Sequence, residues 1–122
     1  MTPSKHVLVL LVDDEPTIRM IASDSLEEAG FDVLEAANAQ EAMTILAERG
    51  DVGLLFTDVD MPGEFDGLAL ADLVHQRWPA IKLVVTSGRS LPRAVPDAGK
   101  FIAKPYNLRA MTDLVEKQSD EP

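Results

Sequence analysis

The 122-residue sequence contains no cysteine, so a disulfide, a thiolate metal site and a thiol nucleophile are all excluded. Long apolar runs are absent too, since the longest, Val7 to Val12, is far too short to span a bilayer. The segment from Met1 to His6 lacks the apolar core and the cleavage site of a signal peptide. We therefore expect a cytoplasmic protein without a membrane segment.

Positive charge is scarce: 11 Lys and Arg residues stand against 21 Asp and Glu residues, for a net charge of −10. That balance opposes direct binding to nucleic acid or to anionic membranes, and it permits cations or basic partners. With 46% hydrophobic residues, the chain can bury a core, and its length suits one domain. We expect a single domain over residues 1–122, with its core between about residues 7 and 117 and no output domain.

Apolar segments with the character of strands alternate with segments of helical spacing. Val7 to Val12 is apolar at every position, which is typical of a parallel strand buried on both faces. Further strands are predicted at Phe31 to Ala36, Val52 to Thr57, Ile81 to Thr86 and Lys100 to Ala103. Strands and helices that alternate with short connections predict an α/β fold with a doubly wound, five-stranded parallel sheet.

Helix boundaries are marked by residues with known capping preferences. Pro16 suits the first position of a helix that Gly30 closes, and Asn38 and Asn107 suit the caps of two later helices. The first helix is expected to bury Ile18, Ile21, Ala22, Ser25, Leu26 and Ala29, and the last one Leu108, Met111, Leu114 and Val115. From Gln118 onwards we expect the chain to fray.

The segment between the fourth and fifth strands is unusual. Residues 89–99 hold two prolines, Pro92 and Pro96, and end in Gly99, which leaves room for at most a turn or two of helix. We therefore predict that the fourth helix is short, distorted or mobile.

Acidic residues follow two of the predicted strands. Asp13 and Asp14 come directly after the first strand, Asp58 after the third, and Asp60 just beyond it. The carboxyl ends of parallel strands meet at one edge of the sheet, where ligands bind in such folds. Anions at the end of a buried strand cost free energy unless a cation compensates them.

The fourth and fifth strands end in groups that can bind an anion: the hydroxyl of Thr86 and the ammonium of Lys104. Oxygen ligands that are mostly carboxylates favour Mg²⁺, which bridges readily to phosphate. A carboxylate nucleophile, a metal ion, a hydroxyl and a lysine together suit phosphoryl transfer. Each of these residues alone would read as an ordinary turn or surface residue, and only their joint occurrence favours a site.

Four pieces of the sequence together resemble the receiver domain of two-component response regulators. They are Val12-Asp13-Asp14-Glu15-Pro16, Asp58-Val59-Asp60-Met61-Pro62 with Asp66-Gly67, Thr86-Ser87-Gly88, and Lys104-Pro105-Tyr106. The resemblance implies a flavodoxin-like sheet of strand order 2-1-3-4-5. It also implies a stand-alone signalling domain that works by conformational switching or phosphorelay, and no enzyme beyond its own phosphorylation and dephosphorylation.

The resemblance also implies roles for the acidic residues. Asp58 would accept a phosphoryl group from a sensor histidine kinase or a histidine phosphotransfer protein. Asp14 and Asp58 would bind Mg²⁺ directly, Asp13 would bind it through water, and the backbone carbonyl of Asp60 would complete the protein ligands. We further hypothesise that the Asp60 side chain sets the lifetime of the acyl phosphate, since the corresponding position varies in the family.

The remaining roles implied by the resemblance belong to the fourth and fifth strand ends. Thr86 and Lys104 would each bind a phosphoryl oxygen, and Tyr106 would rotate inward when Thr86 moves toward the phosphate. The Lys104–Pro105 peptide bond is often cis in this family. The downstream protein partner is not identified by the sequence.

Two alternatives remain open at this point. Asp58 and Asp60 also resemble the nucleophile and acid–base pair of haloacid-dehalogenase-type phosphatases, although Asp13 and Asp14 then precede the motif. The second alternative is a pseudo-receiver that binds partners without phosphorylation.

Overall fold

Five parallel strands form one sheet in the order β2-β1-β3-β4-β5, as predicted. The computed structural model describes residues 7–61, 65–96 and 99–120. The strands are β1 (Leu8–Val12), β2 (Asp32–Ala36), β3 (Val52–Asp58), β4 (Lys82–Ser87) and β5 (Lys100–Ala103). The helices are α1 (Pro16–Glu28), α2 (Ala39–Glu48), α3 (Gly67–Arg77) and α4 (Leu108–Ser119).

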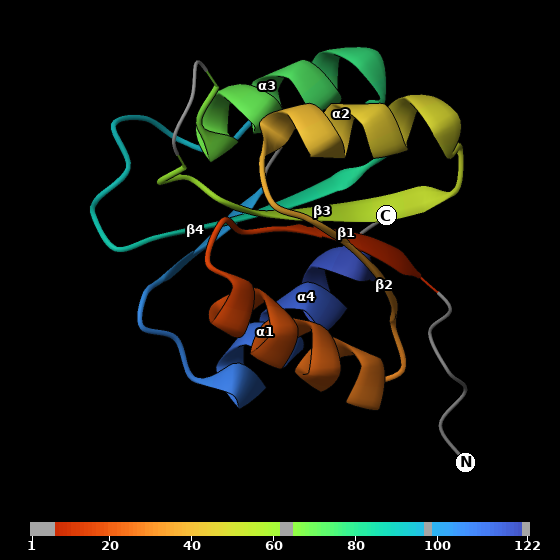
Figure 1. The fold of residues 1–122 in the computed structure, drawn as a ribbon. Helices are drawn as coiled ribbons and strands as arrows, with labels where there is room; N and C mark the ends of the chain where they lie inside the picture. The colour runs from red at the N-terminus through yellow and green to blue at the C-terminus, as the bar shows by residue number, and fades with distance from the viewer. Residues whose placement is uncertain (1–6, 62–64, 97–98, 121–122) are drawn as a thin grey trace.

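Helices cover both faces of the sheet: α2 and α3 lie on one face, α1 and α4 on the other (Figure 1). Strand β1 shows why, because its residues alternate between two separate cores. Leu8, Leu10 and Val12 belong to the core under α2 and α3, whereas Val9 and Leu11 belong to the core under α1 and α4. A strand buried on both faces needs the uninterrupted apolar run that the sequence has there.

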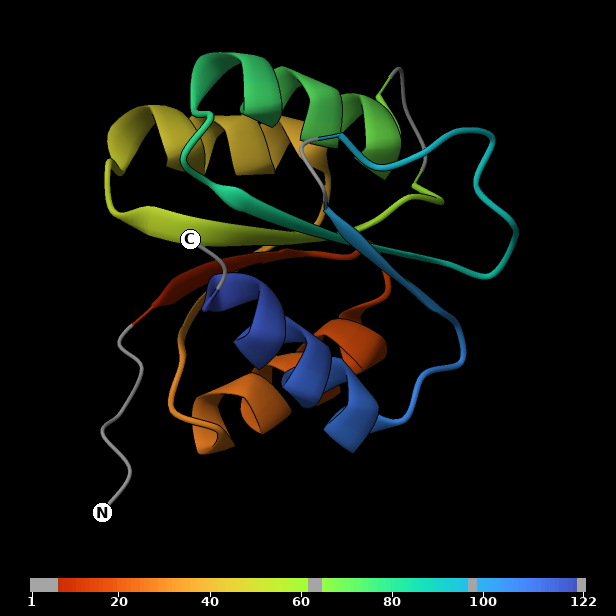
Figure 2. The same ribbon diagram turned by 180° about the vertical axis from the view of Figure 1, so that it is seen from behind.

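The predicted helix between β4 and β5 is not formed in the described residues 88–96 and 99, and the label α4 therefore belongs to the C-terminal helix. Figure 2 shows this crossover as an irregular segment on the outside of the sheet. Leu91 and Val95 pack against the core under α2 and α3, and the Arg93 guanidinium donates a 3.1 Å hydrogen bond to Asp72 of α3. The expectation that no regular fourth helix forms is confirmed, and the described residues of the crossover go further, since they hold no helix at all. Side-chain contacts anchor the crossover in its place.

The predicted helix ends are confirmed. Pro16 is the first residue of α1, and Gly30 after it has a φ of 101°, in the left-handed region that favours glycine. The side chain of Asn38 accepts a hydrogen bond from the amide of Glu41, and Asn107 caps α4 in the same way.

Three apolar residues that we expected inside are exposed. Ile18 and Ile21 of α1 and Leu108 of α4 have relative exposures of 38%, 43% and 38%. Helix α1 buries Ala22 and Leu26 as expected, but it buries Ser23 beside them in place of Ile18 and Ile21, so its inward face is turned slightly from the expected one. The exposed side chains line a groove beside Tyr106, which is described below.

The expected fraying after Lys117 is wrong for the next two residues. Helix α4 continues to Ser119, and Gln118 is buried with its amide nitrogen 3.3 Å from the Leu83 carbonyl oxygen. A buried amide that bonds to the sheet keeps the last turn of the helix in place.

Among the described residues, no helix combines the length and apolarity needed to cross a bilayer.

Candidate functional site

Three carboxylates meet at the carboxyl edge of the sheet. Asp13 and Asp14 follow β1, Asp58 ends β3, and each offers an oxygen that lies within 4.8 Å of the others. Asp13 and Asp58 are buried, at 2% and 3% exposure, whereas Asp14 is exposed. β1 and β3 are neighbours in the sheet, and that pairing is what brings these acids together.

The close approach of α3 helps to fix Asp58. The amide of Gly67, the first residue of α3, donates a 3.0 Å hydrogen bond to the Val59 carbonyl oxygen. A Cβ at Gly67 would lie 1.9 Å from the carbonyl oxygen of Asp58. Only glycine therefore allows the helix to begin against the end of β3.

Lys104 places its ammonium between two of the acids. Its Nζ lies 3.1 Å from an Asp58 carboxylate oxygen and 3.3 Å from an Asp13 carboxylate oxygen. The other Asp58 oxygen accepts a 3.0 Å hydrogen bond from the Asp60 amide. The other Asp13 oxygen accepts a 2.9 Å bond from the Glu15 amide.

These contacts and burial have opposite effects on the pKa values of Asp58 and Lys104. Burial raises the pKa of the Asp58 carboxyl above its ordinary value, although the hydrogen bonds from Lys104 and the Asp60 amide act in the other direction. Burial acts to lower the pKa of Lys104, but its hydrogen bond to Asp58 and the charges of Asp13 and Asp58 together leave that pKa raised. One ammonium shared by two buried carboxylates thus compensates Asp58 only in part.

Thr86 lies in β4, opposite Asp58 of β3 in the sheet register. Thr86 is 1% exposed, and among the described residues its hydroxyl oxygen has no hydrogen-bond partner. A buried hydroxyl without a partner costs free energy, and it is available to donate to an anion bound beside Asp58.

Tyr106 and Pro105 follow β5 on the α1 side of the site. The Tyr106 ring packs with the core under α1 and α4, its centroid 6.0 Å from that of Phe56. Burial, followed by the nearby charge of Asp13, raises the pKa of the Tyr106 hydroxyl. The Lys104–Pro105 peptide bond is cis, as the resemblance implies.

The Asp60 carboxylate binds the end of β4. It accepts hydrogen bonds from the Ser87 hydroxyl at 2.7 Å, the Gly88 amide at 3.2 Å and the Arg89 guanidinium at 2.9 Å. The bonds from Ser87 and Arg89 are the main reasons why the pKa of Asp60 is lowered. This link joins the β3 end to the first residues of the crossover.

The sequence alone gave no role to Ser87, Arg89 or Arg19. Ser87 lies inside a recognised motif, but its bond to Asp60 depends on strand register. Arg19 follows Asp14 in the first turns of α1, and its guanidinium bonds to the Asp13 carbonyl oxygen. A cation near a helix N-terminus is electrostatically unfavourable, so the position of Arg19 was the one feature of the sequence that could have indicated a role for it.

Comparison with known proteins supports the family that the motifs resemble. The family model of the response regulator receiver domain matches residues 9–116. The chain is 34% identical to the sensor kinase CckA of Brucella abortus, over 97% of this chain and 13% of that protein. It is 31% identical to a putative NtrX-like response regulator of Rickettsia felis, over 89% of this chain and 24% of the relative. The chain thus spans about a quarter or less of the length of these relatives.

Solved structures show the same fold. The receiver domain of NtrX from Brucella abortus has a TM-score of 0.84 at 28% identity and covers 93% of this chain and 99% of that chain. The response regulator TrrA of Thermotoga maritima, crystallised with Mg²⁺-BeF, has a TM-score of 0.81 at 27% identity and covers 92% of this chain and 98% of that chain. With the family model matched over most of its length, the chain belongs to the response regulator receiver domains of two-component signalling systems.

Proposed function

We propose that Asp58 accepts a phosphoryl group from a histidine side chain of a partner protein, with Mg²⁺ bound by Asp13, Asp14 and Asp58. The observation on which this depends is the meeting of three carboxylates, whose oxygens lie within 4.8 Å of one another, with the Lys104 ammonium bonded to Asp13 and Asp58. The histidine donor is a sensor kinase or a phosphotransfer protein, in keeping with the CckA and NtrX-like relatives.

The donor set fits Mg²⁺. The ligands are all oxygens, one acid is exposed to water, and the related TrrA was crystallised with Mg²⁺-BeF. When bound, Mg²⁺ supplies positive charge that keeps the acids ionised and neutralises the oxygens of the transferred group. Asp14 and Asp58 are its direct ligands in this proposal, with Asp13 acting through water and Asp60 through its backbone carbonyl.

The chemical step is a displacement at phosphorus. An oxygen of the ionised Asp58 carboxylate forms a bond to phosphorus, the bond from phosphorus to the donor imidazole nitrogen breaks, and its electron pair stays on that nitrogen. Lys104 binds one phosphoryl oxygen through its ammonium, and Thr86 donates its unpartnered hydroxyl to another. This hydrogen bond would draw Thr86 toward the phosphoryl group. Tyr106 would then rotate inward.

The direct test is labelling with a small phosphodonor. We expect Mg²⁺ and acetyl phosphate to give one hydroxylamine-sensitive adduct of a single phosphoryl group, which peptide mass spectrometry locates at Asp58. Because the acids need a cation to stay ionised together, removal of Mg²⁺ by EDTA should lower the labelling at least about tenfold. Stable labelling at another residue, or equal labelling in EDTA, would contradict the proposal.

A groove beside Lys104 supports docking of a protein donor. It has a volume of about 530 Å³ and lies between α1 and the segment that follows β5. Ile18, Ile21, Pro105, Tyr106 and Leu108 supply its apolar lining. Exposed apolar side chains gathered next to a reactive carboxylate are typical of a site that another protein covers.

Helix α1 offers a matched pair of variants for this groove. Ile21→Asp should lower phosphoryl transfer from the cognate donor protein about tenfold, since it removes apolar contact area and places a charge in the groove. Labelling by acetyl phosphate should stay unchanged, because the three acids, Thr86 and Lys104 are all kept. Met20→Asp is the control, because Met20 is 56% exposed on the same helix and does not line the groove. Equal transfer to both variants would show that the donor docks elsewhere.

The alternatives raised by the sequence are not favoured. The receiver match over residues 9–116 covers the segments that a haloacid-dehalogenase-type phosphatase would use differently. A pseudo-receiver has no need of the complete set of acids, hydroxyl and lysine found here. The role of Asp60 in acyl-phosphate lifetime and the cytoplasmic location stay predictions.

A further inference from the structure

Arg19 connects three elements around the acidic edge. From the first turns of α1, its Nη1 donates a 2.7 Å hydrogen bond to the backbone carbonyl oxygen of Asp13. Its Nε donates a 3.1 Å bond to the carboxylate of Glu35 in β2. The Arg19 side chain is only 20% exposed, which indicates a held position and not a freely moving surface arginine.

The carbonyl that Arg19 binds belongs to the peptide between Asp13 and Asp14. On the other side of Asp13, its amide donates a 3.1 Å hydrogen bond to the Ala36 carbonyl oxygen at the end of β2. The main chain of Asp13 is therefore bonded on both sides, and the Arg19 bond fixes the plane of the peptide that carries Asp14. Asp14 is exposed, so no burial holds its side chain toward the other acids.

We propose that Arg19 is a positioning residue for magnesium binding: it fixes the Asp13–Asp14 peptide so that the Asp14 carboxylate faces Asp13 and Asp58, and Glu35 holds the Arg19 fork in place. This inference rests on the proposed function of the three acids. Groups that orient metal ligands without touching the metal commonly change metal affinity by one or two orders of magnitude when they are removed. A planar guanidinium suits the task because two of its N–H groups point to different acceptors at fixed angles.

A positioning role and a purely electrostatic role predict opposite signs. Arg19 is a cation near a cation site, so its charge by itself weakens Mg²⁺ binding, and its removal would then tighten binding. If Arg19 acts by orientation, its removal weakens binding in spite of the charge. Arg19→Lys separates the two further, because it keeps the charge but cannot reach both acceptors with a rigid fork.

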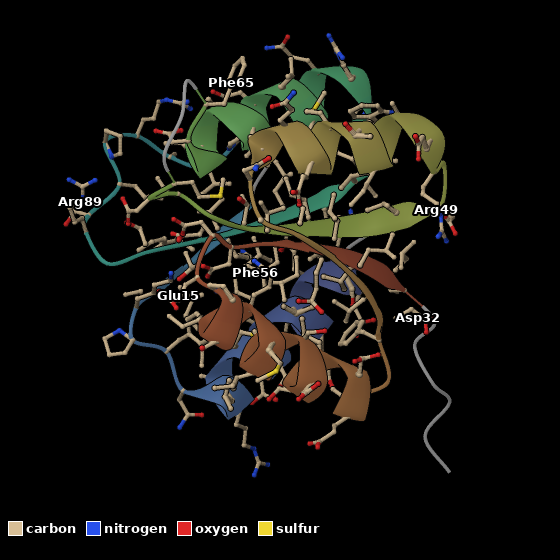
Figure 3. All side chains as sticks on the ribbon, in the orientation of Figure 1. Glu15, Asp32, Arg49, Phe56, Phe65 and Arg89 are labelled. Carbon is tan, nitrogen blue, oxygen red and sulfur yellow. The ribbon has the colours of Figure 1, made fainter. Side chains whose placement is uncertain are left out.

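The experiment is a titration of the full chain with MgCl₂, followed by the backbone amide NMR signals of the site. We expect Arg19→Ala to raise the Mg²⁺ dissociation constant about tenfold, and Arg19→Lys to raise it by less. Before any metal is added, the Asp14 amide signal should move in both variants, since its own peptide loses the bond from the guanidinium. The control is Arg49→Ala, which removes an arginine paired with Asp51 at the opposite edge of the sheet (Figure 3) and should leave the constant unchanged.

Glu35 provides an independent check. Glu35→Ala should weaken Mg²⁺ binding in the wild-type background but have no further effect in Arg19→Ala, because its influence passes through Arg19. If the wild type binds Mg²⁺ and Arg19→Ala binds it equally well or more tightly, the positioning role of Arg19 is overturned and the proposed function stands. No Mg²⁺ binding by the wild type would overturn the proposed function, and this inference with it.

Discussion

Replacing Asp58 by asparagine should abolish phosphoryl labelling and, at the same time, make the unphosphorylated protein more stable at neutral pH. The loss of labelling follows because an amide oxygen is a poor nucleophile and the adduct would lack the acyl phosphate bond. With acetyl phosphate and Mg²⁺, the labelled fraction should fall by at least about two orders of magnitude. Intact-protein mass spectrometry measures it.

The gain in stability follows from the direction of the Asp58 pKa. Burial raises that pKa in the folded protein above the ordinary value of 3.8, so the ionised carboxylate opposes folding at neutral pH. Asparagine has a similar shape without the charge, and it also removes the repulsion from Asp13. Without metal we expect a gain of about 1 kcal/mol, or roughly 4 °C in melting temperature.

The sign of the pH dependence can be stated as well. A group whose folded pKa is raised contributes stability below its unfolded pKa, and that contribution is lost as the pH rises through the folded pKa. The advantage of Asp58→Asn should therefore be full at neutral pH and shrink as the pH falls toward 3.8. Thermal melts by circular dichroism in EDTA at several pH values measure this difference.

Asp51→Asn is the matched control. Asp51 lies just before β3, at the other end of that strand, and its pKa is lowered chiefly by the hydrogen bond from Arg49. Its replacement should give no gain in stability at neutral pH. Added Mg²⁺ should then stabilise the wild type more than Asp58→Asn, because the variant lacks one of the anionic ligands. A less stable Asp58→Asn protein at neutral pH in EDTA would show that Lys104 compensates the buried charge fully.

The fold was predictable because its signals are local and repeated. The apolar run from Val7 to Val12 predicts a strand buried on both faces, and Asn38 and Asn107 predict helix starts. Each of these predictions needs only the local sequence and not the segment that packs against it. The acids at Asp13 and Asp58 could be assigned to one site because parallel strands end at one edge. The missing helix before β5 was also a local signal, given by Pro92 and Pro96.

The contacts that adjust the site were not predictable in the same way. The bonds from Ser87 and Arg89 to Asp60 join residues 27 and 29 positions apart, and they depend on the path of an irregular crossover. The exposure of Ile21 depends on how α1 is rotated over the sheet, which helical spacing alone does not determine. The bond between Arg19 and Glu35 likewise depends on how β2 lies beside α1.

Gly67→Ala should destabilise the protein and disable the site together. Helix propensity by itself predicts the opposite, since alanine in a helix is favoured over glycine by roughly 0.5–1 kcal/mol. The added Cβ, however, would lie 1.9 Å from the Asp58 carbonyl oxygen and 2.8 Å from the Val59 Cα, and both are backbone atoms. Either α3 or the end of β3 must shift, at a cost of roughly 3 kcal/mol, the upper part of the range for overpacked interiors.

The shift would displace the nucleophile as well as the helix. Asp58 is the residue against which α3 begins, and a displacement of about 1 Å at a reacting group can lower a rate by two orders of magnitude. We expect a melting temperature lower by roughly 10 °C, and labelling by acetyl phosphate at least about tenfold slower at a temperature where the variant stays folded. Gly50→Ala is the control, because a Cβ there meets no atom of the described part of the chain within 4 Å. If Gly67→Ala were as stable and as reactive as Gly50→Ala, contact between α3 and the β3 end would not be what holds Asp58 in place.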